Sequence, residues 1–297
     1  MLVIVGSVVL AVLVLGSAGT YLVLSNHKPT ARAVQKSTAR PAPTTTTTAT
    51  AEPTAYVAPT GAAIAALPEA MYSAVIPGLM AYSISTLPTA ADAAYRMAAD
   101  TPIYGTDRST LVARFSAKNF MELDSVVVPV ELDGAWTLVL TPARQQLPSK
   151  NNGQAPAQTV GWVRTSALTK DHALPEHVVV SVSRQTISIA NAAGVVEATY
   201  SAGVGTSSTP TPTDVVGYLE ARYLDPSQGQ AVHPIQLTSL HASAADDPYL
   251  GHDGGLIGLH YNASSTGSVS HGCVRLGIPA IDAVNALPLG TLITLVP

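Results

Sequence analysis

The C-terminal part of the chain alternates apolar and polar positions in a way that predicts short strands. Val178, Val180 and Val182 alternate with their neighbours as in a strand buried on one face, and residues 187–189 continue the pattern. Residues 191–194, Asn-Ala-Ala-Gly, predict a hairpin turn from which a second strand returns. Further strands are predicted at 195–200, 215–223, 255–259 and 292–296.

A helix is predicted over 279–287, because Pro279 stands near its start and Ile281, Val284 and Leu287 lie along one face. Residues 233–250 are polar, and we expect them to form a loop long enough to act as a lid. The predicted fold of residues 173–297 is therefore mainly β: an antiparallel β-sandwich or barrel with one helix packed at its side.

Residues 101–172 predict a small β domain with short apolar runs separated by turns such as Asp133-Gly134. Asp133-Gly134-Ala135-Trp136 and Gly161-Trp162-Val163-Arg164 resemble the bacterial SH3-like modules that precede catalytic domains in envelope proteins. A packing domain or spacer without a ligand is the favoured interpretation, with both tryptophans in the core rather than in a sugar-binding platform.

The N-terminal region predicts a membrane anchor and a linker. Residues 2–24 carry no charge, and a membrane-spanning helix needs ~20 apolar residues. We expect an anchor at 1–25, with a cleaved signal peptide as the alternative. Residues 26–60 are rich in Thr and Pro and predict a linker. The Ala-rich segment 61–100 has no assigned role, although 89–99 could form a helix.

The basic residues near the expected anchor predict one orientation of the chain in the membrane. Four basic residues follow the apolar stretch and none precedes it, so the positive-inside rule would leave the bulk of the chain in the cytoplasm; they are Lys28, Arg32, Lys36 and Arg40. The chain as a whole is nearly neutral, with Lys+Arg 15 against Asp+Glu 19. It has no basic tract interleaved with aromatics, which argues against nucleic acid as a partner.

The only cysteine, Cys273, cannot form an internal disulfide. It is therefore an inert buried thiol, an intermolecular bridge or a nucleophile. Gly272 permits close approach of the backbone to a ligand. A thiol in an apolar core would not need polar neighbours, yet Cys273 is flanked by Ser270, His271 and Arg275. A thiol with a pKa near 8.5 needs a base or cation to act at neutral pH. His271 and His260 are the two histidines close to it in the sequence.

His260, followed by a short loop and then Ser270-His271-Gly272-Cys273-Val274-Arg275, resembles the signature of the L,D-transpeptidase family with the YkuD-type catalytic domain. The resemblance implies that Cys273 is the nucleophile and His260 the base. It makes His271 a residue lining the site. Backbone N–H groups of Gly272 and Cys273, with His271 as a further candidate, would form the oxyanion hole.

The resemblance also implies roles for flanking residues. The carbonyl of Tyr261 would orient the base, Ser270 would line the site, and Arg275 would bind a substrate carboxylate or brace the loop. The loop from His260 to Cys273 is short for the family, and two positions depart from the family pattern. Tyr261 stands where a small residue is common, and Asp214, after Pro210-Thr211-Pro212-Thr213, stands where glycine is usual.

The implied function is a cysteine acyltransferase that forms 3→3 cross-links between peptidoglycan stem peptides at the cell envelope. The resemblance also implies a membrane-anchored protein with its catalytic domain outside the cytoplasm, and we follow it against the charge rule. With water as acceptor it would be an L,D-carboxypeptidase. The family also implies acylation of Cys273 by carbapenems and needs no metal or organic cofactor.

Three other functions compete with this interpretation. One is a catalytically silent wall-binding protein, and another is a soluble intracellular cysteine hydrolase. The third is a zinc peptidase, although no known zinc-binding spacing is present. Its candidate ligands lie in one segment and are His233, His241, Asp246, Asp247, His252 and Asp253.

Overall fold

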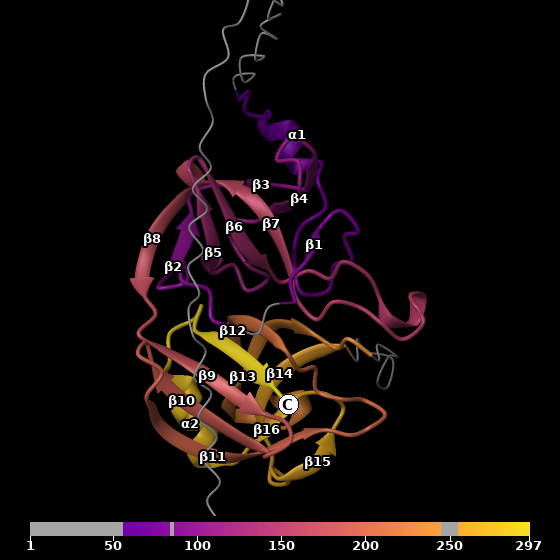
Figure 1. The fold of residues 1–297 in the computed structure, drawn as a ribbon, viewed down its shortest axis with the longest axis vertical. Coiled ribbons are helices and arrows are strands. Elements are labelled where there is room, and N and C mark those ends of the chain that lie inside the picture. Colours follow the sequence, from indigo (N-terminus) through magenta and orange to yellow (C-terminus); the bar gives the residue numbers. More distant parts are fainter. Residues whose placement is uncertain (1–55, 84–85, 245–254) are drawn as a thin grey trace, which may run out of the picture. The chain divides into compact units, whose positions relative to one another are not determined.

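The computed structural model describes residues 56–83, 86–244 and 255–297. The expected anchor at 1–25 and most of the expected linker lie outside these ranges. Within them, no helix is both long and apolar enough to cross a membrane. Residues 56–297 form one unit with two lobes, which we call the N-terminal lobe (56–173) and the barrel lobe (176–297) (Figure 1).

The N-terminal lobe is a small β domain, as its alternating apolar runs predict. After α1 (Gly61–Ala65) comes a six-stranded sheet in the order β4-β3-β7-β6-β5, with β1 paired to β7. Its strands are β1 (Met80–Ala81), β3 (Thr101–Tyr104), β4 (Leu111–Phe115), β5 (Pro129–Asp133), β6 (Trp136–Thr141) and β7 (Thr159–Arg164), and the 3₁₀ turns are η1 (Pro148–Lys150) and η2 (Thr165–Ala167). Trp162 is buried and Trp136 half-buried, while the SH3-like resemblance stays a prediction.

The helix suggested for 89–99 is wrong. This segment forms strand β2 (Ala93–Met97), which pairs antiparallel with β8 (Leu168–Ala173). Ala93, Ala94 and Met97 are its buried residues, and the backbone of Tyr95 exchanges two hydrogen bonds with Val127. The partners lie far away in the sequence, so tertiary pairing overrides the helical preference of an Ala-rich segment.

The barrel lobe is a closed sheet. Its strand order is β10-β9-β17-β12-β13-β14-β16-β11-β15, and an additional pairing of β10 with β11 closes the ring. The strands are β9 (Glu176–Ser181), β10 (Thr186–Asn191), β11 (Val196–Gly205), β12 (Val215–Asp225), β13 (Gln230–His241), β14 (Leu256–Tyr261), β15 (Gly267–Ser270), β16 (Val274–Leu276) and β17 (Leu292–Val296), with 3₁₀ turn η3 (Pro226–Gln228) after β12.

Most of the predicted elements of this lobe are confirmed. The turn at 191–194 joins β10 to β11 with Gly194 at φ 77°, where glycine is favoured. Most pairings are antiparallel, but β9–β17, β14–β16 and β11–β15 are parallel. The loop expected at 233–250 is wrong in its first part, because β13 runs to His241 and pairs with β12 on one side and β14 on the other. The remainder of that segment falls largely outside the described residues.

The core of the barrel lobe is filled from the strands and from helix α2 (Ile278–Ala286). Pro279 lies in its first turn, and Ile281 and Val284 are buried against strand residues such as Leu259 and Val274. This confirms the predicted helix. Fully burying a side chain of this size contributes roughly 1.5–3 kcal/mol, so the helix is held mainly by this face.

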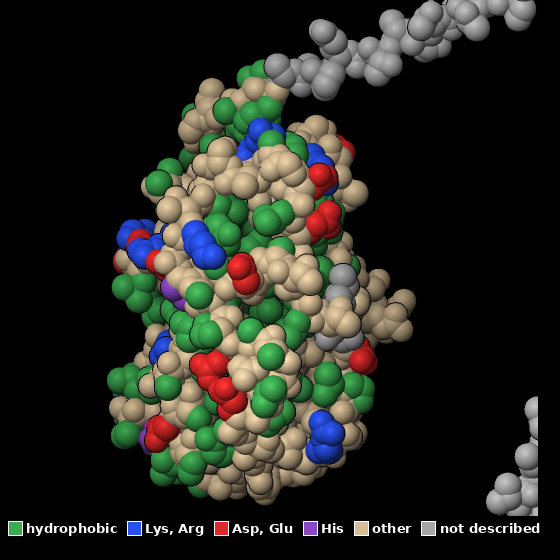
Figure 2. All heavy atoms as spheres, turned by 60° about the vertical axis from the view of Figure 1, so that its left-hand side comes forward, with side chains coloured by type: hydrophobic (Ala, Val, Ile, Leu, Met, Phe, Trp, Pro, Cys, Tyr) green, Lys and Arg blue, Asp and Glu red, His purple; other side chains and the backbone are tan. Residues whose placement is uncertain are grey.

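The two lobes share a continuous apolar cluster. Tyr218 and Leu292 of the barrel lobe pack with Leu140 and Val160 of the N-terminal lobe. In addition, Nε2 of His172 lies 2.9 Å from the carbonyl oxygen of Leu289. Figure 2 shows one face of the molecule, on which acidic and basic side chains are scattered rather than gathered into a patch of one sign.

Candidate active site

The topology brings the predicted nucleophile and base to one face of the sheet. β14 and β16 are adjacent and parallel, with Leu259 opposite Val274 and His260 opposite Arg275. Leu259 and Val274 are fully buried in the barrel core. Side chains alternate along a strand, so His260 and Arg275 point away from that core, as does Cys273 immediately before β16.

The Cys273 thiol is half-buried against the backbone of β14. Its Sγ lies 3.5 Å from the amide nitrogen of Gly258 and 3.5 Å from the carbonyl oxygen of Leu256. Burial raises the pKa of the thiol, while the Gly258 amide and the Arg275 charge act in the opposite direction. The sulfur is therefore protonated at neutral pH and needs a base before it can attack. Neither backbone contact was predicted from the sequence.

His260 is oriented by the backbone carbonyl of the next residue. Its Nδ1 lies 3.0 Å from the oxygen of Tyr261, and since a carbonyl only accepts, Nδ1 carries the proton and Nε2 the lone pair. Burial lowers the pKa of His260, the hydrogen bond to Tyr261 raises it, and the Arg275 charge lowers it; the net direction is down. The imidazole is thus neutral at pH 7. Gln230 donates a second hydrogen bond, 3.0 Å long, to the same carbonyl.

The turn before the cysteine has a conformation that glycine suits. Gly272 has φ 111°, and an added Cβ would lie 3.1 Å from the side chain of Ile257. The Ser270 hydroxyl accepts a hydrogen bond from the Gly272 amide (3.2 Å) and donates one to the Cys273 carbonyl (2.5 Å). The Gly272 N–H expected in the oxyanion hole is therefore already engaged. In the described part of the chain, the Cys273 amide has no acceptor.

Thr211 is a positioning residue that the sequence analysis missed. Its buried hydroxyl donates to the Gly272 carbonyl at 2.7 Å and accepts from the Gly205 amide at 2.8 Å. Next to it, the Thr209 hydroxyl and the Thr206 amide both reach the Ser270 carbonyl. The segment that follows β11 thus fixes the backbone of the motif. The Thr-Pro sequence was the only available signal.

Asp214, at the position where glycine is usual in the family, has φ 58°. This left-handed conformation is costly for residues with a Cβ, although Asp tolerates it better than most. The backbone at Asp214 therefore has a left-handed conformation that favours glycine, which accounts for the glycine usual at this position in the family.

The remaining predicted residues lie around this pair. Arg275 is half-buried, its Nε lacks a hydrogen-bond partner within the described residues, and its charge acts on both Cys273 and His260. His271 is exposed. The Tyr261 ring packs at 5.0 Å from the His233 ring, whose Nδ1 lies 3.1 Å from Asp282.

The zinc-peptidase alternative is not supported by the strand that carries two of its ligands. His233 and His241 are eight residues apart on β13, which corresponds to about 26 Å along an extended strand. They cannot hold the same ion, and the described ranges contain no cluster of potential metal ligands. The other four candidate ligands lie outside those ranges.

The barrel lobe matches the model of a known protein family. Residues 175–295 match the family model described as YkuD, the L,D-transpeptidase catalytic domain. No curated protein matches the chain. Among solved structures, an L,D-transpeptidase from Mycobacterium smegmatis is 14% identical with a TM-score of 0.32, covering 55% of this chain and 91% of that one.

Two structures from Mycobacterium tuberculosis are also similar. L,D-transpeptidase 3, in complex with a faropenem-derived adduct, is 15% identical with a TM-score of 0.34, covering 58% of this chain and 91% of that one. L,D-transpeptidase 1 is 18% identical with a TM-score of 0.29, covering 47% and 78%. The match of the family model spans β9 to β17 and contains Cys273 and His260, so the barrel lobe is similar over residues 175–295 to the L,D-transpeptidase catalytic domain of the YkuD family.

Proposed function

We propose that this chain is a cysteine-dependent L,D-transpeptidase that joins peptidoglycan stem peptides by 3→3 cross-links. The observation that carries the proposal is the placement of the Cys273 thiol and the His260 imidazole on the same face of the neighbouring segments β14 and β16. The proton on Nδ1 of His260 is committed to the Tyr261 carbonyl, which leaves Nε2 as the base.

In the first half-reaction, Nε2 of His260 takes the thiol proton as Sγ of Cys273 attacks the carbonyl carbon after the L-centre of a stem diamino acid. A carbon–sulfur bond forms, and the negative charge on the carbonyl oxygen is stabilised by the Cys273 amide. The carbon–nitrogen bond then breaks, and the terminal D-alanine leaves with the proton that His260 returns to its amine.

In the second half-reaction, an amine of a neighbouring stem attacks the thioester carbon. His260 accepts a proton from that amine and passes it to the departing sulfur, so the thiol and the imidazole return to their starting forms. The alternative function differs only here, because attack by water gives an L,D-carboxypeptidase.

Arg275 supports this chemistry electrostatically. A cation near the sulfur favours the thiolate, and it also disfavours the imidazolium, which keeps His260 in its basic form. Arg275 as a whole is only partly buried, and we assign to its guanidinium group the binding of a substrate carboxylate.

The apolar residues 2–24 and the Thr/Pro-rich segment after them support a membrane anchor at residues 1–25 and a linker at 26–60. An outward-facing catalytic domain follows from the family resemblance, against the distribution of basic residues around the anchor. An epitope tag on the catalytic domain should be digested by protease added to intact cells. Removal of residues 1–25 should abolish this digestion. Protection from protease until the cells are lysed would contradict it.

The activity itself is tested with purified tetrapeptide stems and the full chain, with products followed by mass. The expected product is a dimer of stems with loss of one D-alanine per dimer, absent with Cys273→Ala and His260→Gln. Tripeptide alone would establish the carboxypeptidase. Unchanged stems, with correctly folded protein, would leave the wall-binding alternative.

A further inference from the structure

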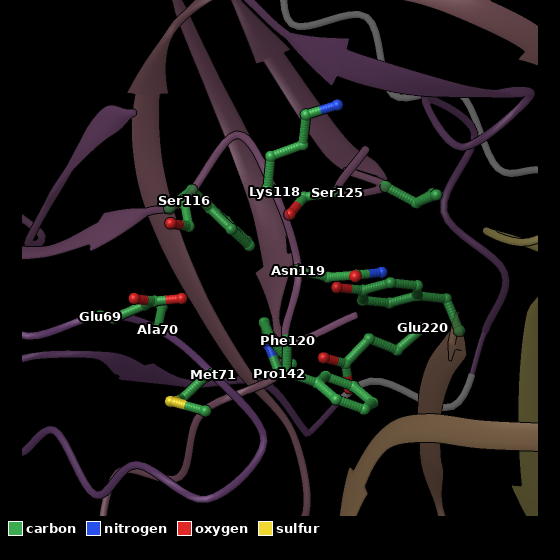
Figure 3. Close-up of a pocket in the computed structure, with 13 residues that line it drawn as sticks. Glu69, Ala70, Met71, Ser116, Lys118, Asn119, Phe120, Ser125, Pro142 and Glu220 are labelled. Atoms are coloured by element: carbon green, nitrogen blue, oxygen red, sulfur yellow. The ribbon is translucent and has the colours of Figure 1, made fainter. Parts of the chain in front are cut away.

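A pocket lies where the N-terminal lobe meets β12, and none of the motif residues 270–275 lines it. It holds a cavity of about 30 Å³, enough for one or two water molecules. Figure 3 shows the Glu220 side chain reaching into it. The polar residues that line it from the N-terminal lobe are Glu69, Ser116, Lys118, Asn119 and Ser125.

Glu220 lies at a β-bulge of β12 and lines this pocket. Leu219 pairs with Thr238 and Ala221 with Leu237, so Glu220 is the extra residue on β12. Leu219 packs in the barrel core, whereas Tyr218 and Glu220 both line the pocket. β-Bulges are over-represented at the rims of barrels and next to active sites.

Among the described residues, the Glu220 carboxyl forms no ion pair with a basic side chain. It is 9% exposed, and within the described ranges its Oε2 has no hydrogen-bond partner. The other charged residues that line the pocket are paired elsewhere: Glu69 with Arg114 at 2.7 Å, and Lys118 with Asp124 at 2.5 Å. Leaving a buried carboxyl unpartnered costs free energy, which a ligand of the right charge would recover.

Two strand spacings separate β12, which lines the pocket, from β14, which contacts the thiol. Ala221, Leu237 and Gly258 are paired across β12, β13 and β14, and the Gly258 amide contacts Sγ of Cys273. Two strand spacings amount to about 10 Å, or about three extended residues of a peptide. A peptide whose carbonyl lies at the sulfur therefore has the length to reach the pocket.

We propose that this pocket binds a primary ammonium group, with Glu220 as its counter-ion. An ammonium head has about the size of a water molecule, and the pocket adds the Phe120 and Tyr218 side chains, whose rings attract cations. We assign the ammonium in the cell to a stem peptide engaged at Cys273, which is the part that rests on the proposed function.

The proposal carries a pH dependence. Burial raises the pKa of Glu220 to about 8, so the empty pocket holds a neutral carboxyl at pH 7 and binding of a cation releases its proton. The titratable groups around it are Glu69, Lys118, Tyr218 and Tyr223; the pKa values of both tyrosines are raised, chiefly by burial. Affinity for a cation should fall on the order of 100-fold between pH 9 and pH 6.

The probe is n-butylammonium chloride, titrated into the full chain and into Cys273→Ala, with binding followed by NMR shifts. Saturable binding at pH 9 is expected in both, because the site does not need the nucleophile. Glu220→Gln should lose at least tenfold in affinity, whereas the same change at an exposed carboxylate, Glu197→Gln, should lose none. Equal binding by Glu220→Gln, or equal binding of neutral n-butanol to wild type, would overturn the proposal.

The link to the stem peptide has its own readout. Acetylating the amines of the donor stem should raise KM at least tenfold for wild type and leave KM of Glu220→Gln nearly unchanged. An equal rise of KM in wild type and Glu220→Gln would show that the stem peptide is not the ligand of Glu220, without contradicting the ammonium site itself. Absence of any turnover would overturn the proposed function alone, since butylammonium binding is measured without it. Melting temperatures of the two glutamine variants, equal to wild type within a few degrees at pH 6, establish that both are folded.

Discussion

At the scale of single residues, the account rests on a thiol and an imidazole that are both neutral at rest. Burial raises the pKa of Cys273 and lowers that of His260, so the structure favours proton transfer during attack over a preformed ion pair. The motif predicted both residues. It could not predict the Gly258 and Leu256 contacts, because they depend on the pairing of β14 with β16.

Removing the base should change the pH profile of acylation as well as its rate. With His260 present, carbapenem acylation should be nearly level from about pH 6.5 to 9, since the imidazole loses its proton below the usual value of 6.5. His260→Gln should instead rise about tenfold per pH unit with the thiolate fraction. Stopped-flow acylation rates test this. A level profile in both proteins would contradict the role of His260.

At the scale of elements, the segment between β11 and β12 fixes the motif. Thr211 contributes two buried hydrogen bonds to Gly205 and Gly272, and Asp214 keeps a left-handed backbone. The bond from Thr211 to Gly272 joins residues 61 positions apart, so alternation of apolar residues along the chain does not reveal it.

Thr211→Val should lose both hydrogen bonds while keeping the shape of the side chain. Leaving a buried donor and acceptor unpaired is expected to cost on the order of 1–3 kcal/mol in the free energy of unfolding. Carbapenem acylation should also slow, since Gly272 precedes the nucleophile. Thr211→Ser retains the hydroxyl and serves as the control, with urea unfolding as the measurement. Equal losses in both variants would show that the methyl group matters instead.

Asp214→Gly should stabilise the protein. Relief of the left-handed backbone is worth about 1 kcal/mol, reduced by the greater entropy of glycine in the unfolded chain. Asp214→Ala keeps a Cβ without the short polar side chain and should destabilise. Melting temperatures of the two variants should therefore shift in opposite directions from wild type, and shifts in the same direction would contradict the strain argument.

Elements with strong local patterns were predictable and those that depend on distant partners were not. The hairpin at 191–194 and helix α2 follow from turn residues and apolar spacing. β2 and the first part of the supposed lid became strands because β8, β12 and β14 supply their hydrogen bonds.

At the scale of the whole molecule, the N-terminal lobe shapes the outer face of the barrel lobe. Tyr218 and Leu292 are buried because the two lobes pack together, and the same packing encloses Glu220. Nothing in the sequence around Glu220 distinguishes it from an exposed strand residue, so the pocket could not be predicted.

The buried carboxyl should make stability fall as pH rises. The pKa of Glu220 is raised from 4.5 to about 8, so between these values the folded chain holds a proton that the unfolded chain has lost. Stability is then lost at up to about 1.4 kcal/mol per pH unit. Glu220→Gln should remove this slope, seen by urea unfolding between pH 5 and 8, whereas Glu197→Gln should keep it. Parallel slopes in all three proteins would contradict the burial of an ionisable group.

The central claim, an acylable thiol at Cys273, is tested most directly by intact mass of the full chain after incubation with a carbapenem, beside Cys273→Ala. The account predicts a stable adduct of one carbapenem on the wild type and none on the variant. No adduct on folded wild-type protein, or an equal adduct on Cys273→Ala, would contradict it.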